Sequence, residues 1–144
     1  MNIIPGVGVH GLRLGMSQAE VIKIMGKPDK IVEEKCVHST WYFYNEWMIT
    51  VSFDWDEMNT LGWIKCSNPE VSLWNHHLIG MHSDVLMKLL KEHKVMEIEY
   101  EEYTSFESID CEDIGIEFIL EFNMVQEVTV GFIFDEAGDI RWIQ

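Results

Sequence analysis

The chain has 144 residues, of which 47% are hydrophobic and 24% are charged, and its formal net charge is -15. This length fits one domain or two small packed subdomains, and the composition is that of a folded protein rather than a disordered one. Residues 70–144 hold seventeen acidic and four basic side chains (net -13), whereas residues 1–69 hold eight and six (net -2). Nucleic acid and anionic membranes are therefore excluded as expected partners, because the second half would repel them.

The compartment is predicted from what the sequence lacks. Its first ten residues have neither a basic region nor an uninterrupted apolar run, which argues against a signal peptide, and no apolar run approaches the length of a membrane span. No Cys-x-x-Cys motif occurs among the three cysteines, Cys36, Cys66 and Cys111. We therefore expect a cytoplasmic protein with free thiols rather than a disulfide scaffold or a zinc site.

The first predicted helix has about ten residues and begins after Ser17. Ser17 and Glu20 have the spacing of a capping box, and Met16 can pack onto Val21 as a hydrophobic staple. The helix should end at Gly26, because glycine accepts a left-handed conformation and a proline follows two residues later.

Three strands are predicted after this helix: Trp41–Tyr44, Trp47–Phe53 and Leu61–Cys66. Their apolar residues alternate, and the pair Asn45-Glu46 is a plausible tight turn. Four consecutive aromatic residues from Trp41 to Tyr44 must place aromatic rings on both faces of their strand. Core packing explains the inward rings, and the outward ones can serve a protein interface or a small ligand.

The same pattern recurs 65 residues later. Gly15-Met16 corresponds to Gly80-Met81 and Lys23 to Lys88, which predicts an internal repeat. The second helix should begin after a cap at Ser83 and end near His93 or Lys94, whose charges suit the helix C-terminus. Four further strands are predicted at Met96–Tyr100, Gly115–Phe122, Val125–Phe134 and Asp139–Ile143.

The predicted fold class is therefore α+β. We expect two similar units, residues 1–68 and 69–144, each with a short helix on an antiparallel meander sheet, and the two sheets can join into one continuous concave surface. The pattern Leu14-Gly15-Met16-Ser17 through Glu20-Val21 to Met25-Gly26-x-Pro28 resembles the unit shared by the beta-lactamase inhibitor protein and small outer-membrane assembly lipoproteins. That resemblance implies a tandem fold and a habit of binding proteins. The second unit departs from it, with Lys91 at the position of Gly26.

The most distinctive segment is acidic and lies in the second unit. Between Glu97 and Glu121 it has ten carboxylates and no Lys or Arg, and it also contains aromatic residues. We expect Met96, Ile98 and Tyr100 to point inward from a strand, and residues 102–113 to form a polar loop. The candidate partner-binding residues are Glu97, Glu99, Tyr100, Glu101, Glu102, Tyr103, Phe106, Glu107, Asp110, Glu112 and Asp113.

Small size, strong acidity and the lack of a catalytic motif are typical of bacterial immunity proteins. We hypothesise that the chain neutralises a basic protein toxin, with a nuclease as the favoured class, because spaced carboxylates can imitate phosphates. Solvated outer strand faces would give the same pattern without a partner. A non-catalytic assembly module is the alternative, and a small metal-dependent hydrolase is a weaker one.

No cofactor, metal or catalytic residue is predicted. His76, His77 and His82 lack the spacing of a zinc-binding helix. Asp110–Asp113 lack the glycine-containing loop of a calcium-binding EF-hand, so a calcium site there is only an outside alternative.

Overall fold

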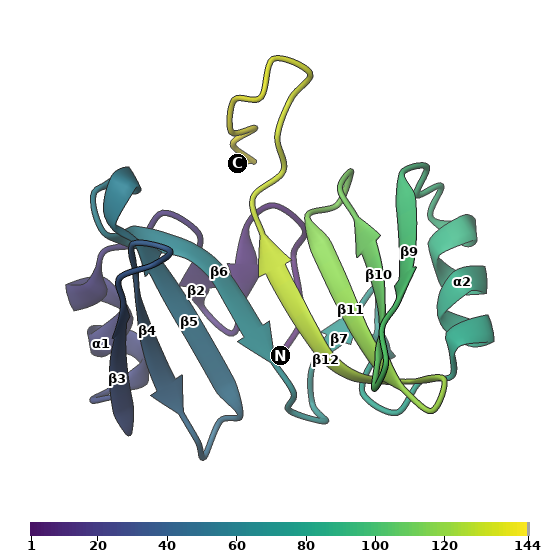
Figure 1. The fold of residues 1–144 in the computed structure, drawn as a ribbon, viewed down its shortest axis with the longest axis horizontal. Coiled ribbons are helices and arrows are strands. Elements are labelled where there is room, and N and C mark those ends of the chain that lie inside the picture. Colours follow the sequence, from purple (N-terminus) through teal and green to yellow (C-terminus); the bar gives the residue numbers. More distant parts are fainter. Residues whose placement is uncertain (144) are drawn as a thin grey trace.

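One eight-stranded antiparallel sheet organises the computed structural model, which describes residues 1–143 (Figure 1). Its strand order is β3-β4-β5-β6-β12-β11-β10-β9. The strands of the first half are β3 (Lys30–Glu34), β4 (Ser39–Tyr44), β5 (Ile49–Asp54) and β6 (Thr60–Cys66). Those of the second half are β9 (Ile98–Glu102), β10 (Glu107–Cys111), β11 (Ile116–Glu121) and β12 (Met124–Gly131). The predicted α+β class is confirmed at this level.

Both halves contain the same order of elements. A two-stranded hairpin comes first, β1 (Gly8–Val9) with β2 (Leu12–Arg13) or β7 (Ser72–Leu73) with β8 (His76–His77). One helix follows, α1 (Gln18–Met25) or α2 (Ser83–Glu92), and then the four strands; a 3-10 turn, η1 (Trp55–Glu57), connects β5 to β6. The halves meet where β6 pairs with β12, with Lys65 opposite Thr129. The sheet is therefore continuous across the predicted boundary.

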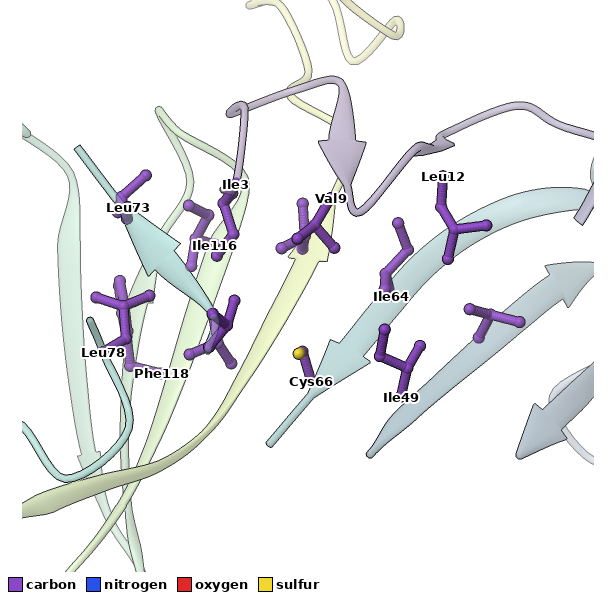
Figure 2. Packing of buried hydrophobic residues seen from close by; sticks show 14 of the residues in the cluster. Ile3, Val9, Leu12, Ile49, Ile64, Cys66, Leu73, Leu78, Ile116 and Phe118 are labelled. Carbon is purple, nitrogen blue, oxygen red and sulfur yellow. The ribbon is translucent and has the colours of Figure 1, made fainter. Parts of the chain in front are cut away.

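The core lies on one face of this sheet and extends through both halves. Ile49, Ile64 and Phe118 from the strands are almost completely buried, together with Ile3 and Leu73 from the N-terminal segment and β7. Figure 2 shows these side chains converging between the strands and the short hairpins. Val21 of α1 and Leu86 of α2 join the same cluster, so both helices cover this face. Neither helix is long and apolar enough to cross a membrane, and the same holds for every helix within residues 1–143.

The predicted start and end of α1 are confirmed. Ser17 Oγ accepts from the backbone N–H of Glu20 at 3.2 Å, and the Glu20 carboxylate accepts from the N–H of Ser17 at 3.3 Å. Gly26 is the C-cap with a φ of 83°. The cap predicted for α2 is wrong by one residue: His82 occupies that position, and its Nδ1 accepts from the N–H of Asp84 at 3.1 Å.

Two strand predictions are wrong, and one further strand was not predicted. Residues 107–111 form β10 rather than part of a long loop, and residues 30–34, for which no element was predicted, form the edge strand β3. In the segment Asp139–Ile143, only Ile140 makes a strand-like contact, an isolated bridge to Phe134. Ile98 packs against the core, and Tyr100 lies on the same side of β9, opposite Ile109, although it is 55% exposed. The predicted burial of Met96 is wrong, since Met96 precedes β9 and is 82% exposed.

Candidate functional site

The face of the sheet opposite the core is the candidate functional surface, called the open face below. In β4 the rings of Tyr42 and Tyr44 are buried in the core, whereas Trp41 and Phe43 alternate with them and are half-buried on the open face. The expectation of aromatic rings on both faces is thus confirmed. In the second half the same alternation brings carboxylates to the open face, because strand residues point to opposite sides in turn.

A row of three carboxylates crosses the second half of the open face. Asp110 of β10 is paired in register with Glu99 of β9 on one side and with Glu117 of β11 on the other. Glu101 lies two residues along β9 from Glu99, opposite Ser108. Like charges directly opposite one another destabilise a sheet, so this row costs the isolated protein free energy.

The electrostatics of the row centre on Asp110. Partial burial raises the pKa of its carboxyl group, and the neighbouring charges of Glu117 and Glu99 raise it further. The Ser108 hydroxyl donates to Glu117 Oε2 at 3.3 Å. Carboxylate oxygens of Glu99, Asp110 and Glu112 all lie within 4.8 Å of one another, an arrangement that a bound cation would relieve.

Three of the candidate residues, Tyr100, Glu102 and Glu107, do not share this surface. Tyr100 lies on the opposite side of β9, where its hydroxyl donates to Glu107 Oε2 at 2.7 Å. This hydrogen bond is the main cause that raises the pKa of Tyr100 to about 12. Glu102 pairs in register with Glu107 on that same side. The acidic segment is therefore divided between the two sides of the sheet.

Other members of the candidate set lie at the ends of β9 and β10. Tyr103 and Phe106 stack in the β9–β10 turn with ring centroids 4.6 Å apart, and the Tyr103 hydroxyl donates to Glu101. Near the opposite end, Asp113 Oδ2 accepts from the N–H of Met96 at 2.8 Å, and Glu97 precedes β9.

Residues 132–143 follow β12 and extend beyond the ends of the strands, as Figure 1 shows. Two grooves flank this segment and share Phe132 and Phe134 in their walls. The acidic groove has a volume of about 800 Å³ and lies over the second half. Its charged lining residues are Glu97, Asp110, Glu112, Asp113, Glu117, Asp135, Glu136 and Arg141.

The second groove, called the aromatic groove below, lies over the first half and has a volume of about 770 Å³. Trp41 and Trp63 form one side of it, with ring centroids 5.7 Å apart in an edge-to-face arrangement. Trp142 contributes from the C-terminal segment and packs edge-to-face on Phe132 at 5.3 Å. The sequence predicted outward aromatic rings on β4, but it did not indicate that the C-terminal segment forms a groove with them.

Comparison with known proteins identifies the fold alone. No family model matches the chain, and no curated protein does either. A DUF4309 family protein from Bacillus subtilis is 17% identical with a TM-score of 0.56, covering 88% of this chain and 87% of its own. An extracellular protein containing an SCP domain from Bacillus anthracis is 12% identical with a TM-score of 0.53. That match covers 81% of this chain, which spans only 43% of the Bacillus anthracis protein. Neither of these two is a beta-lactamase inhibitor protein or an assembly lipoprotein, so that resemblance stays a prediction.

Proposed function

We propose that this chain is a non-catalytic binding protein that captures a basic protein partner on the acidic half of its open face. The partner is a bacterial toxin that the complex neutralises in the cytoplasm. The observation that carries the proposal is the register of Asp110 with both Glu99 and Glu117, which concentrates negative charge on an uncovered face. A basic side chain of a partner protein bound there would relieve the repulsion among these carboxylates, which is uncompensated in the free protein.

The arrangement of the carboxylates favours a nuclease as the toxin. Neighbouring strands lie about 4.8 Å apart, and alternate residues along a strand lie about 7 Å apart, so the face displays a regular array of negative charge. A nuclease binds phosphates with a surface of complementary charge. Charge complementarity would also raise the association rate from about 10⁵–10⁶ M⁻¹s⁻¹ toward roughly 10⁸–10⁹ M⁻¹s⁻¹, which suits an inhibitor that must act before its target does.

A duplicated two-unit organisation is part of this proposal. The symmetric strand order around the β6–β12 pair supports it, as does the order of hairpin, helix and four strands in each half. In this interpretation residues 1–68 and 69–144 are related units that have diverged in charge. The acidic unit supplies attraction, and the near-neutral unit supplies aromatic contacts.

The aromatic groove favours a second candidate function, a protein-binding or assembly module with an uncharged partner. Half-buried tryptophans beside a groove are typical anchors of protein interfaces. Dependence on salt separates the two candidates. Binding through the acidic half weakens as salt rises, whereas binding by apolar anchors alone changes little.

The direct test screens the products of the neighbouring genes for a basic toxin. Co-expression should protect cells from that protein, and the association rate should fall steeply with salt. The variant Glu99→Lys/Glu101→Lys should slow association at least tenfold and abolish protection. Treatment with EDTA should leave binding unchanged, because the proposal involves no metal.

The matched control is Glu70→Lys/Glu92→Lys, which has the same net charge as the first variant. Both residues are exposed, and Glu92 lies on α2, which covers the core face. If the two variants bind equally well, or if binding is independent of salt, the acidic half of the open face is not the interface.

A further inference from the structure

The aromatic groove combines a wall of rings with negative charge. Its rings come from Trp41, Trp63, Phe132, Phe134 and Trp142, and its charged lining residues are Asp54, Glu57 and Asp139. We propose that this groove binds an arginine side chain presented by an extended segment of the partner. This inference rests on the proposed function in one respect, that the partner is a basic protein.

The register of the strands places an acid beside the tryptophans. On the open face, Trp41 of β4, Ser52 of β5 and Trp63 of β6 are paired in one row. Asp54 lies two residues along β5 from Ser52, so its Cα is about 7 Å further on the same face. Its Oδ1 accepts from the backbone N–H of Asp56 at 2.9 Å, which fixes the carboxylate at the groove. A planar cation can therefore stack on an indole and reach a carboxylate from the same position.

The surroundings of the groove already contain cation–π contacts. Lys65 Nζ lies 5.4 Å from the centre of the Trp63 ring, and Lys30 Nζ lies 5.7 Å from the centre of the Phe43 ring. Neither lysine lines the groove, and no lysine or arginine among the described residues does. The groove is thus an aromatic site with negative charge and no cation of its own. That charge distribution selects a cationic ligand.

Arginine satisfies this chemistry better than lysine or a sugar. Its guanidinium group is planar, stacks on aromatic rings, is weakly hydrated and donates to a carboxylate through a fork of N–H groups. A lysine ammonium is a compact, strongly hydrated charge that gains less from a flat indole. A neutral sugar could stack on the tryptophans but would leave the carboxylates without a countercharge.

The test uses the pentapeptide acetyl-Gly-Ser-Arg-Ser-Gly-amide at physiological salt. Both of its ends are blocked, so the arginine side chain is its single charge. The control peptide has citrulline in place of arginine, which has the same shape without the charge. NMR of the six tryptophan indole N–H groups reports the location of binding. The arginine peptide should shift the signals of Trp41, Trp63 and Trp142 saturably. The signals of Trp47 and Trp74, which do not line the groove, should stay in place.

A pair of isosteric variants tests the charge. Asp54→Asn keeps an oxygen that can accept from Asp56, yet it should weaken binding of the arginine peptide about tenfold. Asp56→Asn changes an exposed carboxylate outside the groove and should leave the affinity unchanged. The inference is wrong if the citrulline peptide binds equally well, if Asp54→Asn has no effect, or if cellotetraose binds there in preference to the peptide.

These results are independent of the test of the acidic half. If Glu99→Lys/Glu101→Lys slows association with the basic partner but the arginine peptide does not bind in the aromatic groove, this inference fails and the proposed function stands. If the peptide binds the groove while the partner associates independently of salt and of those two residues, the proposed function fails instead.

Discussion

Asp110 lies directly opposite Glu117 across the β10–β11 pair, and both side chains line the acidic groove. The pair has no basic neighbour at its register position, since Glu99 is on the other side of Asp110. The negative charges of Asp110 and Glu117 therefore lower the stability of the sheet. A surface optimised only for folding would alternate signs at such positions.

Asp110→Asn should stabilise the protein at neutral pH. Burial and the charges of Glu117 and Glu99 raise the folded-state pKa of Asp110 above its ordinary value of 3.8. Below that value the carboxyl is protonated in both states and costs nothing; as pH rises through the window between the two pKa values, the folded state loses stability. The variant should gain up to about 1 kcal/mol at pH 7, as measured by urea unfolding.

The same unfolding experiment at pH 3 provides the internal control. There the gain should disappear, because wild-type Asp110 is then uncharged. A gain of equal size at both pH values would mean that the effect of the substitution is not electrostatic. The variant should also bind the basic partner more weakly, so that stability and affinity change in opposite directions.

Some of the fold can be predicted because local chemistry determines it. The capping box at Ser17 and Gly26 at the other end fix α1 through neighbouring residues, and the sequence shows both. The α2 cap was missed because a histidine nitrogen can replace the hydroxyl of Ser83 as the acceptor. The open-face position of Glu99 and Glu101 follows from simple alternation.

Other parts depend on packing that the sequence does not reveal. In β10 the alternating Ile109 and Cys111 are buried, but the carboxylates around them favoured a loop. Edge strand β3 lacks a buried residue and therefore lacks a period-two signal. The segment that ends in Trp142 has strand-like alternation, yet it packs on Phe132 and next to Gly15 rather than in the sheet. The aromatic groove depends on that packing and could not be foreseen.

Ser17→Ala should destabilise the protein by about 1 kcal/mol, because the backbone N–H of Glu20 loses its acceptor. Ser83→Ala is the matched control at the start of α2. His82, not Ser83, provides the side-chain acceptor there, so this change should stay within about 0.5 kcal/mol. Chemical denaturation of both variants measures the two effects. Equal losses would contradict the assignment of the α2 cap.

One of the three cysteines should react with a thiol reagent in the native protein. Cys36 is exposed, whereas Cys66 and Cys111 are buried. Burial raises the pKa of the Cys66 thiol, and burial together with nearby Asp113 and Asp110 raises the pKa of Cys111 to about 12. At pH 8 neither buried thiol is accessible or ionised enough to react.

Titration with Ellman's reagent at pH 8 counts the reactive thiols. We expect one rapid equivalent in native protein, three after denaturation, and no rapid phase in a Cys36→Ser variant. Rapid modification of two or more thiols in the native state would show that the strands carrying Cys66 or Cys111 open readily.

Gly115→Ala should be far more damaging than Gly26→Ala, although both glycines have a positive φ. A Cβ at Gly26 meets nothing within 4 Å, so the cost is that of its positive-φ extended backbone (φ 83°, ψ -168°) alone, about 1–3 kcal/mol. A Cβ at Gly115 would lie 2.6 Å from the carbonyl oxygen of Gly131 and 3.0 Å from that of Phe132. Both are backbone atoms where β12 leads into the C-terminal segment, so the chain itself would have to move. Thermal unfolding should show a clearly larger loss for Gly115→Ala, and the indole signal of Trp142 should shift only in that variant. Equal losses and an unmoved Trp142 would mean that the C-terminal segment is not held against the β10–β11 turn.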